Sequence, residues 1–325
     1  MKKINCPKVG SFLEIPSLGM FKVSRVFPGH NRIVLQAVGN GLCRMIKVFG
    51  ETVEIASDQA VGFISDIYEY RRQLESLGVR VPPLESIQVF SYRNNVSGRL
   101  NITEISPFYG ESFEDMFLNA PDAKESLSLQ RRMLKCLGGL FEKSPGDFLS
   151  VGIDLIPRNF TGDGQDWYVD LVPPKLRKGE KFQLEIPEVT EPNCYRVGVD
   201  RHYKKSGVVR VLLVQLAKLR PEMYPVFARG IEEFLALKGE NKTLKSFRSR
   251  PIAKKPEKII NKKNISEMSF MDIYDLREIA CWSAGQGKIS PDELENFFRL
   301  SHFQSEPLPE KALKELRQIL IHALC

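Results

Sequence analysis

The residues best suited to chemistry in this sequence lie close together, in the stretch VGIDLIPRNFTGDGQDWYVDLVPP at positions 151–174. Asp154 and Asn159 are separated by four residues, and Asp170 follows the short apolar run Trp-Tyr-Val. Their side chains end in the oxygen atoms that Mg²⁺ requires as ligands, and a carboxylate can also accept a proton. Asp and Asn are also common turn residues, so the spacing alone leaves an ordinary polar loop as the alternative.

The surroundings of these residues favour a functional interpretation. The loop follows a long amphipathic segment, and Gly162-Asp163-Gly164 predicts a hairpin turn before Asp170. The pattern Asp-Leu-x-Pro-x-Asn resembles the catalytic loop of kinases, and the aspartate on the next strand resembles their metal-binding aspartate. The resemblance implies that Asp154 is the catalytic base, and that Asn159 and Asp170 are metal ligands that hold Mg²⁺ on the phosphates of ATP.

A lysine within an apolar strand is the next candidate. Lys47 lies in Arg-Met-Ile-Lys-Val, which resembles the kinase strand whose lysine contacts the nucleotide phosphates. A buried lysine needs an anionic partner, and the following helix supplies Glu69, with Glu75 as the runner-up. The phrase Leu-x-x-Leu-Gly-x-x-Val-Pro, which ends at Pro82, closely resembles the helix exit of aminoglycoside phosphotransferases. The alternative is a strand-edge lysine that reaches water.

Two further segments extend this resemblance to a nucleotide site. Residues 100–108 resemble the strand and connector against which adenine packs, so the main-chain groups of Glu104 and Ser106 are expected to contact the base. The loop at 28–31 occupies the position of the phosphate-covering loop, where Gly29 would let backbone amides approach an anion. An ordinary final strand is the alternative interpretation of the first segment.

The pattern of apolar residues indicates the elements that must position these side chains. Period-two patterns and turn signals predict a strand-rich first third, and Pro82 and Pro83 end its one helix. The predicted elements of this part are strands at 20–27, 32–38 and 42–49, a helix at 58–78, and strands at 86–92 and 100–106.

Helical spacing dominates beyond Pro107, with Ser290 as a capping signal late in the chain. We therefore expect an α+β, bilobal protein-kinase-like fold with a five-stranded antiparallel N-lobe sheet, one helix and a mostly helical C-lobe. The expected domains are an N-terminal nucleotide-binding lobe at 1–105 and a C-terminal catalytic and substrate lobe at 106–325. Helices are predicted at 126–141, at 208–237 with a break near Pro221 and Pro225, at 271–285, at 291–298 and at 310–324.

Composition sets limits on function and location. The formal net charge is +7, from 47 basic and 40 acidic residues, and its excess lies between 238 and 263. We interpret residues 238–268 as a basic linker or surface segment, and we do not expect nucleic acid as a partner. Six cysteines without a Cys-x-x-Cys pair indicate a reducing compartment. Without an apolar run long enough for a signal peptide or a membrane span, a cytoplasmic protein is expected.

The function that the resemblance implies is an ATP- and Mg²⁺-dependent phosphotransferase, similar to the aminoglycoside and choline phosphotransferases, that acts on a hydroxyl of a small molecule. Two departures from the family pattern leave an inactive nucleotide-binding scaffold as the alternative: Gly152 replaces the usual histidine, and Leu-Val-Pro-Pro follows Asp170. A basic polyanion or nucleic-acid binder is the third hypothesis. The four histidines show no ligand spacing and are expected to be structural or surface residues.

Overall fold

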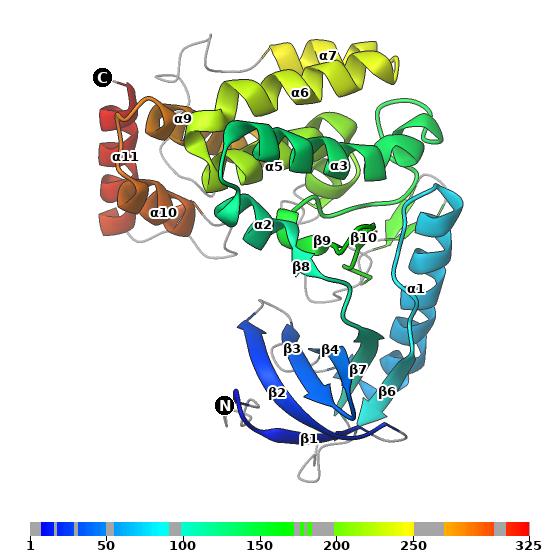
Figure 1. Cartoon of the computed structure of the whole chain (residues 1–325). Helices are drawn as coiled ribbons and strands as arrows, with labels where there is room; N and C mark the ends of the chain where they lie inside the picture. Colours follow the sequence, from blue (N-terminus) through cyan, green and yellow to red (C-terminus); the bar gives the residue numbers. More distant parts are fainter. Residues whose placement is uncertain are drawn as a thin grey trace. The chain divides into compact units, whose positions relative to one another are not determined.

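The computed structural model forms two compact units, one made of Met1–Arg71 and Val81–Gly110 and the other of Arg72–Arg80 and Glu111–Cys325. The predicted α+β fold class is confirmed, because the first unit holds an antiparallel sheet with one helix and the second is mostly helical (Figure 1). The structure describes residues 8–15, 18–28, 32–49, 55–90, 99–171, 176–178, 181–183, 198–249, 270–301 and 310–324.

The first four strands of the sheet in the first unit pair in sequence order, and β7 then pairs with β4, β5 and β6. The order of the sheet is β1-β2-β3-β4-β7-β5, with β6 paired to β7. Asn40 and Gly41 both have positive φ, 51° and 73°, which is the backbone of the tight turn that joins two twisted strands. The elements are β1 (Phe12–Ile15), β2 (Gly19–Pro28), β3 (Arg32–Gly39), β4 (Leu42–Phe49), β5 (Ile55–Ala56), α1 (Ser57–Ser76), β6 (Ser86–Phe90) and β7 (Arg99–Pro107).

The expected number of five strands was wrong, since the sheet has seven. The five predicted strands correspond to β2, β3, β4, β6 and β7, and the prediction missed β1 and β5. Both are short, four and two residues, so neither repeats an alternating pattern long enough to stand out from a loop.

The alternation of side chains divides the sheet into two faces. Ile46 and Ile105 pair across β4 and β7 and join a buried apolar cluster on one face. The residues that pair on either side of them, Lys47 with Glu104 and Met45 with Ser106, therefore point to the opposite face. The buried cluster consists of Ile15, Phe21, Val23, Leu35, Ala37, Ile46 and Ile105.

The second unit is organised around α5 (Lys205–Leu219), whose residues from Val208 to Val214 are all buried. Such a helix needs neighbours on every side, and α6, α7 and α9 pack against it. The expected break near Pro221 is present as a short 3-10 turn, Pro221–Met223, ahead of α6. The other helices are α2 (Phe113–Asn119), α3 (Ala123–Glu142), α6 (Tyr224–Leu237), α7 (Asn241–Arg248), α9 (Phe270–Gly285), α10 (Pro291–Leu300) and α11 (Glu310–Leu324).

Two local predictions can be compared directly with this unit. Ser290 caps α10 through a complete capping box with Glu293, as its sequence indicated. Part of the segment interpreted as a basic linker is instead helix α7, which buries Leu244 and Phe247. Residues 250–269, which hold the rest of that segment, lie outside the described residues. Within the described ranges, no helix is long and apolar enough to cross a membrane.

A close approach between α3 and the chain after α1 predicts an asymmetry between two adjacent glycines. A Cβ on Gly139 would lie 2.3 Å from the Leu77 carbonyl oxygen, whereas one on Gly138 would meet only the flexible end of Lys238, at 3.1 Å. Gly139→Ala should therefore lower the free energy of unfolding by about 1–3 kcal/mol. Urea unfolding of the purified variant measures the change.

Gly138→Ala is the matched control, because it changes the same residue type in the same helix. It should be neutral or stabilising by up to about 1 kcal/mol, since alanine favours the helix. Equal stabilities of the two variants would contradict the packing described for Gly139.

Candidate active site

A small hairpin brings the three predicted polar residues together in the second unit. The chain passes from the 3-10 turn Pro157–Asn159 into β9 (Phe160–Gly162) and returns as β10 (Asp166–Tyr168). β8 (Glu111–Ser112) pairs with the other edge of β9. The Val169 amide donates to the Asn159 carbonyl oxygen at 2.9 Å, so Asn159 and Asp170 meet at the open end of the hairpin.

Aromatic packing fixes the base of this hairpin. Phe160 contacts Phe113 and Tyr168 edge to face, with ring centroids 6.2 Å and 5.3 Å apart, and all three are fully buried. The Tyr168 hydroxyl accepts a hydrogen bond from the Asp154 amide at 3.2 Å. The buried aromatic cluster therefore holds the backbone of Asp154 as well as the hairpin.

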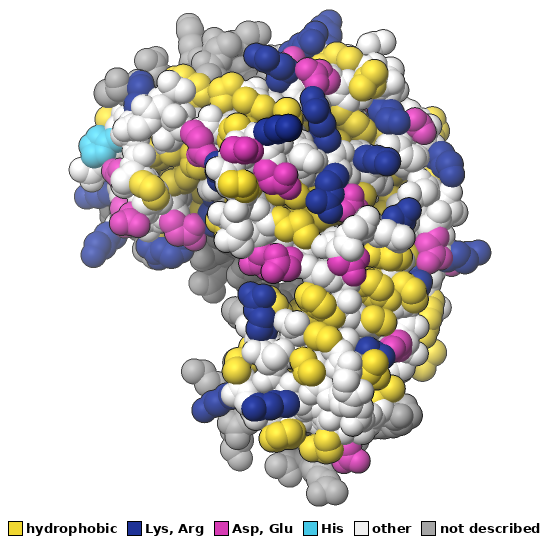
Figure 2. Space-filling model, in the orientation of Figure 1, with side chains coloured by type: hydrophobic (Ala, Val, Ile, Leu, Met, Phe, Trp, Pro, Cys, Tyr) yellow, Lys and Arg dark blue, Asp and Glu magenta, His cyan; other side chains and the backbone are white. Residues whose placement is uncertain are grey.

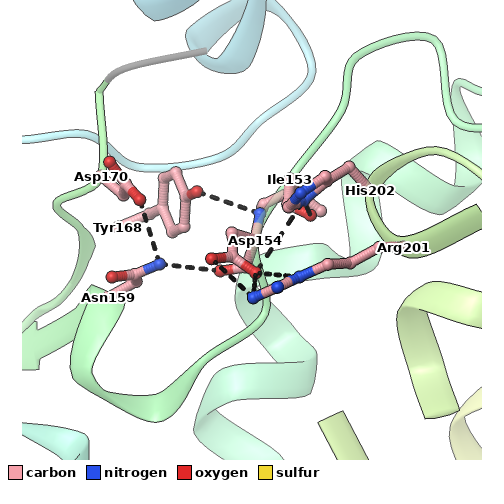
Figure 3. A network of polar contacts seen from close by, with 7 residues as sticks. All are labelled: Ile153, Asp154, Asn159, Tyr168, Asp170, Arg201 and His202. Atoms are coloured by element: carbon pink, nitrogen blue, oxygen red, sulfur yellow. Dashed lines mark hydrogen bonds and ion pairs between the residues drawn. The ribbon is translucent and has the colours of Figure 1, made fainter. Parts of the chain in front are cut away.

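Asn159 joins the other two residues through one nitrogen atom. Its Nδ2 donates to the main-chain oxygen of Asp154 at 3.1 Å and to Oδ2 of Asp170 at 3.2 Å (Figure 3). Only 4% of Asn159 is exposed. A residue at this position that could not donate these two hydrogen bonds would leave buried polar groups unpaired. The three residues chosen from sequence thus form one hydrogen-bonded network.

The chemistry of this network fits a hard divalent cation. Because Nδ2 of Asn159 makes the protein bonds, Oδ1 is its atom that could act as a ligand, next to the carboxylate of Asp170. One amide and one carboxylate suit Mg²⁺, which keeps several waters and takes further oxygens from phosphates. Among the described residues, no group of three or more His, Cys, Asp or Glu could hold a metal ion.

An arginine that the sequence analysis did not select completes the site. Arg201 donates to Asp154 from Nη2 at 3.0 Å to Oδ1 and 3.3 Å to Oδ2, and from Nε at 3.3 Å to Oδ1. Burial by itself lowers the pKa of Arg201, but the charges of Asp154, Tyr274 and Asp170 and the hydrogen bonding with Asp154 together outweigh burial and raise the pKa above its usual value. The guanidinium is permanently charged, and it compensates the negative charge of the carboxylate.

His202 also lies in the site, although it was expected to be structural. Its Nδ1 is 3.2 Å from the Ile153 carbonyl oxygen and 3.9 Å from Oδ1 of Asp154. Gly152 cannot offer a side-chain contact of this kind at the start of the loop. A histidine from a distant part of the chain therefore lies beside Ile153 and Asp154 in the site.

Main-chain pairing explains why these two residues reach Asp154. The Ile153 amide donates to the His202 carbonyl oxygen at 3.0 Å, and the Leu149 amide donates to the Tyr203 carbonyl oxygen at 2.8 Å. The segment just before α5 thus lies along the segment just before Asp154. Arg201 and His202 come 47 and 48 positions after Asp154, and no short motif links them to it, so sequence spacing offered no signal.

Most of the residues predicted for the nucleotide site lie on described elements of the first unit. Lys47 is buried and its Nζ lies 2.9 Å from Oε1 of Glu104, a side-chain contact that the sequence analysis did not foresee. Glu104 was proposed only as a main-chain contact to adenine, and that role stays a prediction, as does the role of Ser106. Glu69 is half-buried on α1, whereas the runner-up Glu75 is exposed. Gly29 lies outside the described residues.

The basic segment gives little support to a polyanion-binding surface. Acidic partners neutralise several of its described cations: Lys238 pairs with Glu142 at 2.5 Å and Arg248 with Glu232 at 3.1 Å. Lys242 pairs with Asp147. On the face of the second unit in Figure 2, basic and acidic side chains are interspersed.

Comparisons with known proteins give a limited result. No protein-family model matches the sequence, and no curated protein matches it either. Among solved structures, the chain is similar to a MAP kinase from Leishmania major at 13% identity, with 92% of this chain and 77% of that chain covered and a TM-score of 0.34.

Replacement of Asn159 by aspartate is expected to destabilise the protein to an extent that depends on pH. Asn159→Asp removes the donor to Asp170 and places a second carboxylate beside it, so we expect the free energy of unfolding at pH 7 to fall by about 1–3 kcal/mol. Two neighbouring carboxylates raise the pKa of one of them in the folded state. The loss of unfolding free energy should therefore be greatest above that raised pKa, and it should shrink as the pH falls toward about 5.

Urea unfolding at pH 7 and pH 5 tests this expectation. Asn119→Asp, at the exposed end of α2, is the control and should change stability by less than about 0.5 kcal/mol at both values. An Asn159→Asp variant as stable as the wild type at pH 7 would be incompatible with the network.

Proposed function

We propose that the protein is a phosphotransferase of the protein-kinase-like type, which uses ATP and Mg²⁺ to phosphorylate a hydroxyl group of a small molecule. The observation that carries the proposal is the pair of hydrogen bonds from Asn159 to Asp154 and Asp170. Residues chosen for their motif spacing thereby come together in space, which an ordinary polar loop gives no reason to expect.

In this proposal Asp154 orients the acceptor hydroxyl and accepts its proton. Both oxygens of its carboxylate contact Arg201, but Oδ2 has a single such contact at 3.3 Å, whereas Oδ1 has two and also faces His202. Oδ2 is therefore the better placed of the two to receive a hydroxyl donor. The side chain is held from two directions, which favours one orientation for the acceptor.

Asn159 and Asp170 would hold Mg²⁺ on the nucleotide phosphates, through Oδ1 of the amide and the carboxylate oxygens. The bound metal and nucleotide supply the phosphoryl group and the charge neutralisation that its transfer requires. The hydrogen bond between Nδ2 of Asn159 and Oδ2 of Asp170 keeps the two ligands at one place before any ion arrives. Because the two side chains are already held together, less conformational entropy would be lost when the ion binds.

Arg201 sets the charge around the proposed base. The guanidinium lies beside both oxygens of Asp154, so the main effect of Asp154 would be to orient the hydroxyl, with proton transfer late in the reaction. Arg201 is also a donor close to the atoms where charge would develop. Lys47 is proposed to contact the nucleotide phosphates from the first unit.

The acceptor stays undefined in the proposal beyond a small hydroxyl compound. A protein acceptor is less favoured, because no Ala-Pro-Glu motif ends the segment after Asp170. The inactive scaffold remains the alternative, and it predicts ATP binding without turnover. The paired cations of α7 give no specific reason to favour a polyanion binder.

Separate substitutions of the two aspartates test their different roles. Asp170→Asn should abolish the Mg²⁺-dependent part of ATP binding, since it removes the carboxylate ligand. Asp154→Asn should keep that binding and reduce ATP turnover by at least about 100-fold, the usual scale for a positioned base. Thermal-shift titration with ATP, with and without Mg²⁺, and turnover with a pool of small hydroxyl compounds provide the two readouts.

Asp163→Asn is the matched control, because Asp163 is an exposed carboxylate in the turn of the same hairpin. It should leave binding and turnover within about twofold of the wild type. Full turnover by the Asp154→Asn variant would refute the mechanism. ATP binding by the wild type without any turnover would support the scaffold instead.

A further inference from the structure

The buried ion pair of the first unit lies in an apolar row of the sheet. Lys47 on β4 is directly opposite Glu104 on β7, and Lys47 Nζ is 2.9 Å from Glu104 Oε1. The residues next along this row are Val34 on β3 and Ile87 on β6, both apolar. No other charge is therefore opposite either member of the pair within the row.

Burial makes this pair energetically demanding. Lys47 is 5% exposed and Glu104 is 1% exposed, so both charges are almost completely removed from water. Oε2 of Glu104 is buried and has no hydrogen-bond partner among the described residues. Desolvated charges of this kind depend strongly on each other, because removing one takes a close counter-charge away from the other.

We infer that Glu104 is a positioning residue for nucleotide binding: its carboxylate fixes the charged amine of Lys47 from within the sheet, so that Lys47 can contact the phosphates. The inference rests on the proposed function, and it gives the side chain of Glu104 a role separate from the main-chain contact expected from sequence. An ammonium group has three donors, so one can remain on Glu104 while another reaches a phosphate oxygen.

The physical reason is the cost of holding a charged amine in a buried position. Without the Glu104 carboxylate, the charged amine of Lys47 would be held less firmly within the sheet, and this weakens its contact with phosphate. If the Glu104 carboxylate only competed with phosphate for the Lys47 amine, the effect on affinity would have the opposite sign. Removal of the carboxylate would then release Lys47 and strengthen phosphate binding. The sign of the change in affinity therefore separates the two possibilities.

Calorimetric titration with the β,γ-imido analogue of ATP and with adenosine tests the inference. Glu104→Gln keeps the shape of the side chain and removes its charge. It should lower the affinity for the analogue by about tenfold, which corresponds to the loss of one charge-assisted contact. Adenosine has no phosphate, so its affinity should stay within about twofold. Glu104→Asp keeps a carboxylate and should lie between the wild type and Glu104→Gln.

Thr103→Val is the control within the same strand, because Thr103 is buried and points to the opposite face. It should leave both affinities unchanged. Tighter or unchanged analogue binding by Glu104→Gln would overturn the inference, and so would an equal loss for adenosine, which would indicate a purely structural role. A wild type that binds neither compound would overturn the proposed function and this inference together.

Stability provides a second readout in case Glu104→Gln folds poorly. Lys47→Met should destabilise the protein strongly, because it leaves the buried carboxylate unpaired, and the double variant Lys47→Met with Glu104→Gln should regain part of that stability. Additive effects of the two changes in urea unfolding would contradict the coupling on which the inference depends.

Discussion

The amide nitrogen of Asn159 is the atom on which the candidate site depends. It bonds the main chain of Asp154 and the carboxylate of Asp170 at once, at 3.1 Å and 3.2 Å. Because the side chain is buried, these bonds cannot be exchanged for bonds to water without cost. Buried aromatic residues fix the base of the hairpin formed by β9 and β10. The hairpin places Asn159 where its one nitrogen reaches both partners.

The remaining support comes from a distant part of the chain. The residues just before α5 pair with the segment before Asp154 through main-chain bonds, and this brings Arg201 and His202 to its carboxylate. Gly207 contributes to this arrangement, because a Cβ there would lie 1.9 Å from the Asp200 carbonyl oxygen. The start of α5 therefore packs tightly against the turn that carries Arg201.

Much of the fold was predictable because it follows from local patterns. Alternating apolar residues indicated β2, β3 and β4. The capping residue Ser290 marked the start of α10, and Pro221 marked the end of α5. Asp154, Asn159 and Asp170 lie in one short stretch of the sequence, so they could be predicted for the same reason. Arg201 and the side-chain contact between Glu104 and Lys47 could not be, because these contacts arise from tertiary pairing between segments 47 and 57 positions apart.

The most direct test of the account is a crystal structure of the wild-type protein with a non-hydrolysable ATP analogue and Mn²⁺, which anomalous scattering can locate. We expect a metal ion bound by Oδ1 of Asn159 and the carboxylate of Asp170, with phosphate oxygens among its other ligands. A metal–nucleotide complex bound elsewhere, with Asn159 and Asp170 still joined only to each other, would contradict it.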